Sequence, residues 1–253
     1  MTEESNAPAV PKLATTYLYF LTPYFVSVSV LYLWGFWTTF HINILEYLSI
    51  TDVVRLTAYP IASAFISVAV GAVLSEATMG DAFPSGGGRN TPTGIFLRRI
   101  APYLIGIYAL GTTVLLLSDL PTKWYVLPLL LAIPASIIAK ERGLLIEVIP
   151  KDSVRSVGIF LLALLPPSAF GQGRIGAMNV IEGLRFDYVL SPIDQVSVPP
   201  DDTPSQRLRF LGHTGDFYFY LNPTDSAIVI TKFKDDRTLL LKHFDRAVEK
   251  SGH

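Results

Sequence analysis

Residues 13–40 form an unbroken apolar stretch near the start of the chain. The stretch has no Asp, Glu, Lys, Arg or His. Since about 20 apolar residues let a helix cross a bilayer, the stretch is long enough to predict a membrane-spanning helix. A soluble domain would have to bury such a helix on every side. Tyrosines and tryptophans lie toward its two ends, as is typical of helices that meet both surfaces of a membrane.

Similar apolar segments recur through the first two thirds of the chain. They predict a membrane α-helical bundle of four to five transmembrane helices. The last segment is short for a span and includes Pro166 and Pro167, so we interpret it as a span and keep a re-entrant segment as the alternative. The predicted spans cover residues 17–40, 53–74, 100–118, 124–139 and 156–172.

A short amphipathic segment, residues 41–52, separates the first two predicted spans. Its apolar residues, Leu45 among them, recur at helical spacing beside a polar stripe, which favours a helix lying at the membrane surface. Ser49 and Asp52 have the spacing of a capping box. The polar residues here are either a solvated face with an ion pair at a helix start, or a polar mouth that contacts a ligand or partner. This candidate polar interface cluster comprises His41, Asn43, Glu46, Asp52 and Arg55.

After residue 173 the pattern changes to short alternating runs separated by turn residues. The pattern predicts a small antiparallel β domain, either a sheet or an open barrel. In the third run the alternation places Tyr218 and Tyr220 on the face opposite Phe219. These tyrosines are a candidate partner-binding surface, and the alternative is that they cover the opposite face of a small barrel. The predicted strands cover residues 185–190, 206–211, 217–221, 227–233 and 238–241.

The distribution of charge supports a domain boundary near residue 173. Residues 1–173 include ten Lys/Arg and ten Asp/Glu, whereas the 80 residues that follow include ten and eleven. The formal net charge of −1 provides no basic field for nucleic acid. We therefore expect a polar leader at residues 1–16, a transmembrane helical domain at 17–173 and a soluble β-rich domain at 174–253.

Lysine and arginine are concentrated on one side of the predicted topology. Eight lie in the leader and in the loops around residues 75–99 and 140–155, against two, Arg55 and Lys123, on the other side. By the positive-inside rule, this bias predicts a multi-pass protein of the plasma (inner) membrane with a cytoplasmic N-terminus. The β domain is extracytoplasmic if the fifth segment crosses, and cytoplasmic if that segment only re-enters.

The chain offers no recognisable catalytic constellation. It has no cysteine, and its four histidines lack metal-ligand spacing. The glycine run at residues 86–88 lacks the lysine and the preceding strand of a phosphate-binding loop. We therefore expect no catalytic, cofactor or metal site and no enzymatic activity.

These patterns predict an integral membrane protein whose β domain binds a protein partner, in a sensor, assembly or immunity-type role. The alternative is a channel or transporter formed by the helices, alone or as an oligomer. Prolines interpreted as helix breaks, at Pro60, Pro134 and Pro166, favour this alternative. The lack of an ionisable residue near any predicted bilayer centre counts against it.

Overall fold

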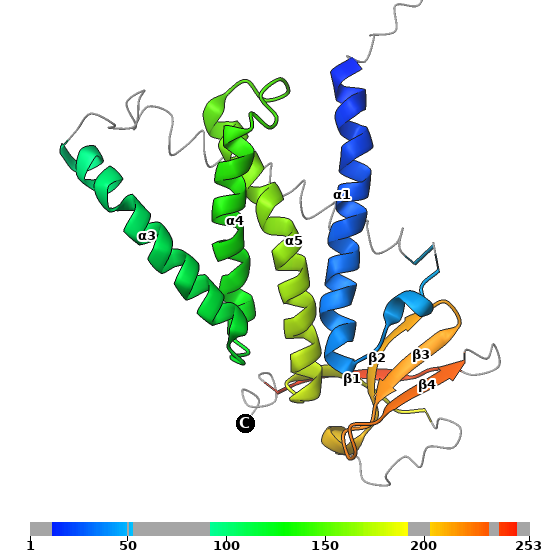
Figure 1. The fold of residues 1–253 in the computed structure, drawn as a ribbon. Helices are drawn as coiled ribbons and strands as arrows, with labels where there is room; N and C mark the ends of the chain where they lie inside the picture. Colours follow the sequence, from blue (N-terminus) through cyan, green and yellow to red (C-terminus); the bar gives the residue numbers. More distant parts are fainter. Residues whose placement is uncertain (1–11, 50, 53–91, 192–202, 233–237, 247–253) are drawn as a thin grey trace, which may run out of the picture. The chain divides into compact units, whose positions relative to one another are not determined.

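The described part of the chain forms two compact units (Figure 1). The first draws on Met1–Ser29 and Thr57–Ser168, and the second on Val30–Leu56 and Ala169–His253. The predicted second span, Arg55 and most of the predicted leader lie outside the described residues. The computed structural model describes residues 12–49, 51–52, 92–191, 203–232 and 238–246.

The first unit is helical, and its helices coincide with four of the five apolar segments. Helices α3 and α4 are joined by the short connection at residues 118–122 and pack together as a hairpin. Residues 92–99, predicted to belong to a loop, are the first turns of α3, where Pro92 occupies a position that tolerates proline. The helices are α1 (Lys12–Trp37), α3 (Pro92–Leu117), α4 (Lys123–Glu141) and α5 (Asp152–Ile181), of which α1 and α5 contribute to both units.

Proline does not interrupt α4. A proline inside a helix leaves the carbonyl four residues earlier without its backbone donor. Pro134 does this to the carbonyl of Leu130, and the hydroxyl of Tyr108 in α3 donates a hydrogen bond to that oxygen. A side chain from the neighbouring helix therefore replaces the missing backbone donor, as an apolar surrounding requires.

Helix α5 continues through both of its prolines, and at Pro166 a side chain again replaces the missing donor. Pro166 leaves the carbonyl of Leu162 without its backbone donor, and the hydroxyl of Tyr24 in α1 donates to it. At about 1.5 Å per residue the helix extends roughly 45 Å, longer than the ~30 Å hydrocarbon core of a bilayer. It is a single continuous helix from Asp152 to Ile181.

Three described helical segments are long and apolar enough to cross a membrane: Arg99–Leu117, Lys123–Glu141 and Val154–Ile181. In the first, only 6% of the most apolar window is buried inside the protein. Tyr103 and Leu117 are 74% and 80% exposed. A helix with apolar side chains exposed on all sides is typical of a lipid surrounding. The chain is thus a membrane protein by the character of its helices, and the helical part followed by a small β domain agrees with the predicted fold class. The number of spans stays a prediction.

The second unit contains a five-stranded antiparallel sheet with the strand order β4-β3-β2-β1-β5. β4 and β5 lie at opposite edges, so the described strands form an open sheet. A bulge between Phe210 and Gly212 shifts the register of β2 against β3. The strands are β1 (Arg185–Val189), β2 (Arg209–Thr214), β3 (Phe217–Leu221), β4 (Ile228–Lys232) and β5 (Leu241–Asp245).

Four of the predicted strands are present, and β2 begins later than expected, at Arg209, because Pro204–Gln206 forms a 3-10 turn. The strand predicted at residues 238–241 was wrong: residues 238–240 are outside any strand, and pairing with β1 places β5 at Leu241–Asp245, where the sequence pattern predicted a short helix or a frayed end. Residues 174–181, assigned to the β-rich tail from their sequence, are the last turns of α5. Gly173, just before them, allows α5 to pack closely against α1.

The inner face of the sheet shares one core with the ends of α1 and α5. Trp37, the last residue of α1, meets Phe219 of β3 edge-on, with ring centroids 4.8 Å apart. Phe219 is 0% exposed and Trp37 is 3% exposed. The core also includes residues from both helices and five strand or turn segments: Leu33, Phe40, Ile44, Ala177, Val180, Phe186, Tyr188, Leu211 and Leu221.

Two glycines let the backbones of α1 and α5 approach within this unit. A Cβ added to Gly35 would lie 2.2 Å from the Phe170 carbonyl oxygen, and one added to Gly173 would lie 2.2 Å from that of Tyr32. Real Cβ atoms do not approach backbone oxygens so closely. The contact therefore requires glycine on both helices.

The segment after α1 folds onto the sheet instead of forming a surface helix. It contains the 3-10 turns Thr38–Phe40 and Ile44–Glu46. Ile44 is buried in the shared core, and the ring of Tyr47 lies 5.2 Å from that of Phe219. Leu45, expected on the apolar face, is 61% exposed. The predicted amphipathic helix is wrong here, because turns place Ile44 against the sheet and direct Leu45 outward.

Candidate functional site

The structure brings only part of the predicted polar interface cluster together. His41 is exposed and has a left-handed backbone with φ of 58°. The amide of Asn43 donates to the Glu46 carboxylate at 2.7 Å, a contact within one turn. Asp52 lies at the start of the next helical segment, and Arg55 is outside the described residues. The predicted Asp52–Arg55 ion pair therefore stays a prediction.

Asp52 completes the predicted capping box and also joins this segment to the sheet. Its backbone N–H donates to the Ser49 hydroxyl at 3.2 Å, and its carboxylate accepts from the Ser49 N–H and hydroxyl at 3.2 and 2.7 Å. The same carboxylate accepts from the N–H of Gly215, in the β2–β3 turn, at 2.9 Å. The Ser49 hydroxyl, followed by the two backbone donors, holds the pKa of Asp52 below its usual value.

Arg209 is the charged residue of the shared core, with 8% of its surface exposed. Its Nη1 donates to the carbonyl oxygens of Val180 and Ile181 at 2.5 and 2.9 Å, so it caps the C-terminal end of α5. Its guanidinium carbon lies 4.6 Å from the ring centroid of Phe186. Burial lowers the pKa of Arg209 from its ordinary value, and within the described ranges no carboxylate pairs with it. The buried Nε has no hydrogen-bond partner in that part of the chain.

A cavity of about 230 Å³ opens beside Arg209. Its walls come from the turn after α1, the end of α5, strands β2 to β4 and the β3–β4 turn. None of the described residues that line it is acidic. Two of them, His41 and Ser226, have left-handed backbones with φ of 58°. The lining residues are Thr39, Phe40, His41, Ile181, Arg209, Leu221, Pro223, Ser226 and Ile228.

A larger groove of about 610 Å³ follows the end of α1 and the turns after it. Its lining is mainly apolar, with two tryptophans, and His41 belongs to both hollows. The lining residues are Val30, Trp34, Trp37, Thr38, His41, Ile42, Asn43, Ile44 and Leu45.

The two candidate tyrosines face away from the shared core, as their alternation predicted. Tyr220 is nevertheless 3% exposed, because it packs with Val189 and Leu208 in a second cluster on the outer face of the sheet. Burial raises the pKa of Tyr220. Tyr218 is half-buried and stacks on Tyr220 with centroids 6.4 Å apart. Only Tyr218 of the pair is available to a partner, and whether it binds one stays a prediction.

Two ion pairs cross from β1 to β5 on the same outer face. Arg185 bonds to Asp245 at 2.8 Å, and His243 Nδ1 lies 2.8 Å from Asp187. These four residues are register partners across the strands. Their side chains are partly or largely exposed, so we interpret the pairs as cross-strand stabilisation of modest size.

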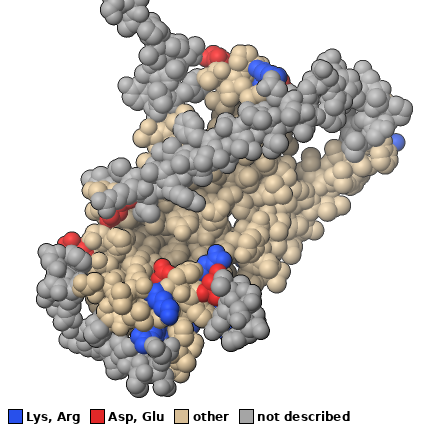
Figure 2. Space-filling model, turned by 180° about the vertical axis from the view of Figure 1, so that it is seen from behind, with Lys and Arg blue, Asp and Glu red and all other residues tan. Residues whose placement is uncertain are grey.

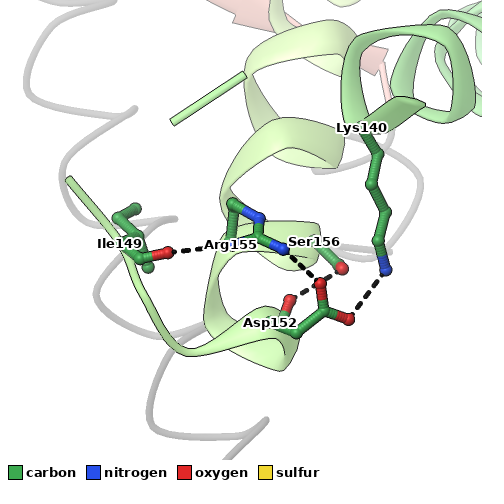
Figure 3. Close-up of polar contacts among 5 residues, drawn as sticks. All are labelled: Lys140, Ile149, Asp152, Arg155 and Ser156. Atoms are coloured by element: carbon green, nitrogen blue, oxygen red, sulfur yellow. Dashed lines mark hydrogen bonds and ion pairs between the residues drawn. The ribbon is translucent and has the colours of Figure 1, made fainter. Parts of the chain in front are cut away.

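A separate polar group ties the α4–α5 loop to the start of α5 (Figure 3). The Asp152 carboxylate accepts from Lys140 at 2.9 Å and from Arg155 at 2.5 Å, and Arg155 also donates to the Ile149 carbonyl oxygen. Lys140, followed by Arg155, lowers the pKa of Asp152. The group fixes the geometry of the loop.

Charged side chains are scarce over the helices. On the face drawn in Figure 2 the described helices present a broad surface without Lys, Arg, Asp or Glu, and the coloured side chains gather away from it. Among the residues that the structure describes, no three His, Asp or Glu side chains are grouped to hold a metal ion.

Arg209 and Ser226 were not predicted as site residues. The alternation of residues 206–211 placed Leu208 and Phe210 on one face, which leaves Arg209 on the face that packs on the helices. An arginine at a core-facing strand position is the signal that could have identified it. Ser226 has no comparable signal, since its role comes from the shape of the β3–β4 turn.

Comparison with protein-family models, with curated proteins and with solved structures finds no match for this chain.

Proposed function

We propose that this chain is a non-enzymatic integral membrane protein whose helices fix a small β unit at the membrane surface, where the unit binds a protein partner. The carrying observation is the shared core of Trp37 and Phe219 with the ends of α1 and α5. Such a core holds the sheet rigidly at the point where two predicted spans end. A flexible tether would need no such core.

The shared core also supports a crossing by α5. Residues 41–49 follow α1, and the sheet follows α5. Because residues 41–49 pack on the sheet, we place both on the same side of the membrane. From residue 49 to α5 the proposed topology crosses three times, through residues 53–74, α3 and α4. A fourth crossing by α5 returns the chain to the side of residues 41–49. The proposal therefore has five spans, a cytoplasmic N-terminus and an extracytoplasmic sheet.

The partner surface in this proposal is the outer face of the sheet around Tyr218. Its ring lies 6.1 Å from that of Phe210 and 5.7 Å from that of His213. Half-buried aromatic side chains of this kind offer contact area at low entropic cost. Tyr220 supports the surface from beneath and does not reach a partner itself.

The transporter alternative loses part of its support. It relied on prolines as helix breaks, and α4 and α5 remain helical at Pro134 and Pro166. Pro60 lies outside the described residues.

Cysteine labelling tests the topology, because the chain has no native cysteine. Asp225→Cys in the β3–β4 turn and Arg142→Cys in the α4–α5 loop each provide a single thiol. In sealed inside-out vesicles, a membrane-impermeant maleimide is expected to label the Arg142 variant only. Labelling of both variants, or of neither before detergent is added, contradicts the five-span proposal.

Photocrosslinking tests the partner surface. A benzophenone amino acid at Tyr218 is expected to give one discrete protein adduct in intact membranes. The matched control is Tyr103, whose side chain on α3 is exposed and is expected to crosslink to lipid only. Equal adducts from both positions, or solute flux through vesicles reconstituted with the purified protein, would overturn the proposed function.

A further inference from the structure

We propose that the cavity beside Arg209 binds a phosphate group. The cavity is small, below the roughly 300–1,000 Å³ of pockets for drug-sized ligands, so it suits one compact group. The phosphate can belong to a lipid headgroup or to a free ion, and the experiment below separates these sources. Binding of a lipid headgroup rests on the proposed function in the membrane, whereas binding of a free phosphate ion does not.

The charge balance of the cavity favours an anion. Arg209, which is itself only 8% exposed, brings a full positive charge to the cavity, and none of the described residues that line the cavity is acidic. The α5 carbonyls that Arg209 caps carry about half a unit of negative charge, which leaves a positive excess. A second arginine, Arg174, contacts the lining residue Thr39, because its Nη1 donates to the Thr39 hydroxyl at 3.1 Å.

The donors of the cavity also match a phosphate. Arg209 uses Nη1 for the two α5 carbonyls, and its buried Nε has no partner among the described residues. Guanidinium groups bind phosphate oxygens strongly and often through two nitrogens. His41, in the turn after α1, and Ser226, in the β3–β4 turn, also line the cavity; their side chains are an imidazole and a hydroxyl.

Two exposed residues with left-handed backbones reach this one cavity. Of the three described non-glycine residues with positive φ, His41 and Ser226 line it. Such conformations cost about 1–3 kcal/mol each and persist where the surrounding structure imposes them. Their coincidence at a charged cavity favours a site over a packing defect. Asp225, next to Ser226, directs its carboxylate to the Ala227 N–H.

The test adds a carboxylate to the cavity and leaves Arg209 unchanged. Ser226→Asp introduces the charge, and Ser226→Asn is the neutral control of the same shape. Both residues tolerate the left-handed region better than serine, so folding is expected to be kept. Arg209→Gln is less informative, because it also removes the cap of α5. Arg207→Gln removes a neighbouring arginine that does not line the cavity and controls for net charge.

Inorganic phosphate is titrated into the full chain in dodecyl maltoside, a detergent without phosphate, and binding is followed by calorimetry. We expect saturable binding that Ser226→Asp weakens at least tenfold, about 1.4 kcal/mol, and that Ser226→Asn and Arg207→Gln change less than threefold. No saturable binding of phosphate in this assay and in the lipid assay below overturns the proposal. Equal affinity of the wild type and Ser226→Asp also overturns it.

The lipid assay compares dioctanoyl phosphatidic acid with dioctanoylglycerol, which has the same acyl chains and no phosphate. If a headgroup is the source, phosphatidic acid binds at least tenfold more tightly than inorganic phosphate and is weakened by Ser226→Asp. If the free ion is the source, the two phosphates bind alike. Binding of dioctanoylglycerol as tight as that of phosphatidic acid overturns the proposal. Both assays use solubilised protein, so their failure leaves the labelling and crosslinking results on the proposed function intact.

Discussion

The hydroxyl of Tyr24 in α1 donates to the carbonyl oxygen of Leu162 in α5, the oxygen that Pro166 leaves without a backbone donor. Tyr108 does the same for the Leu130 carbonyl below Pro134. In both cases the helix that has a proline obtains its missing hydrogen bond from a neighbour. The prolines thus connect helices instead of breaking them.

This relationship predicts that the effect of Tyr24→Phe depends on Pro166. In the wild type, Tyr24→Phe is expected to lower the free energy of unfolding by about 0.6–1.7 kcal/mol, the range for hydrogen bonds between membrane helices. In a Pro166→Ala background the backbone N–H of residue 166 satisfies Leu162, so the same change is expected to cost close to nothing. Thermal unfolding of the four proteins of this cycle in detergent measures the coupling. Additive effects of the two substitutions would show that Tyr24 does not serve the Leu162 carbonyl.

The glycine contact between α1 and α5 predicts a steep response to one methyl group. Gly35→Ala is expected to destabilise the second unit by about 3 kcal/mol or more, because the added Cβ meets backbone of the other helix. Gly173→Ala is expected to behave in the same way. Gly111 in α3 is the matched control, since a Cβ there meets nothing within 4 Å. Gly111→Ala is expected to be neutral or to stabilise by about 0.5–1 kcal/mol. Chemical unfolding in detergent measures the free energy of unfolding of each variant. Equal stability of all three variants would mean that the helices do not touch at Gly35 and Gly173.

Replacing each of the two tryptophans at the end of α1 by alanine is expected to reduce stability to very different extents. Trp37→Ala removes a buried ring from the shared core and is expected to cost about 3–5 kcal/mol. Trp34 is 58% exposed and meets only the ring edge of Phe170, so Trp34→Ala is expected to cost about 1 kcal/mol. Protease resistance of the sheet in detergent, read as the fraction of intact tail, measures the difference. If the Trp37 variant were as resistant to protease as the Trp34 variant, the stability of the sheet would not depend on its packing against α1.

Asp52 makes the stability of the second unit depend on pH. Its pKa is lower in the folded protein than the ordinary value of about 3.9, chiefly through the Ser49 hydroxyl, so the ionised group favours folding. The contribution is present above that ordinary value and is lost as the pH falls through the folded pKa. Asp52→Asn is therefore expected to cost about 1 kcal/mol at pH 7, a typical value for a lost cap, and progressively less below pH ~4.

The control for Asp52 is Glu46→Gln. The Glu46 carboxylate bonds to Asn43 within its own turn and does not join the segment to the sheet through a bond that the structure describes. We expect its effect to stay within about 0.5 kcal/mol. Unfolding by denaturant at pH 3, 4, 5 and 7 supplies the comparison. A constant effect of Asp52→Asn across this range would show that the carboxylate charge plays no part.

The apolar segments and alternating runs were sufficient to predict the four described α-helices and strands β1 to β4. Periodicity identifies an element when one face or the whole surface is apolar, and this holds for α3, α4 and β3. The end of α5 was missed because Gly173 and its neighbours resemble a linker, and only the partner helix explains why they are small. The segment at Ile44 was assigned the wrong local structure for a related reason: its burial depends on Phe219, more than 170 residues later in the chain.

The candidate site was predicted only in part. His41 was selected as a polar residue near a membrane surface, and it does line the cavity. Arg209 lies in a strand of ordinary appearance, and its importance comes from the α5 carbonyls that it caps. Single-sequence patterns describe neighbours along the chain, whereas this cavity joins the ends of α1, α5 and three strands.

The pairing of residues near position 40 with strands beyond position 210 also sets the order of assembly during synthesis. At a translation rate of about 5–20 residues per second, the end of α1 waits roughly 10–35 s for β3 to be made. Until then Trp37 and Ile44 have no sheet to cover them, and a chaperone or the lipid surface has to shield them. The sheet closes only after the last helix is in place, so a nascent chain that fails to insert α5 leaves its own first helix uncovered and open to proteolysis.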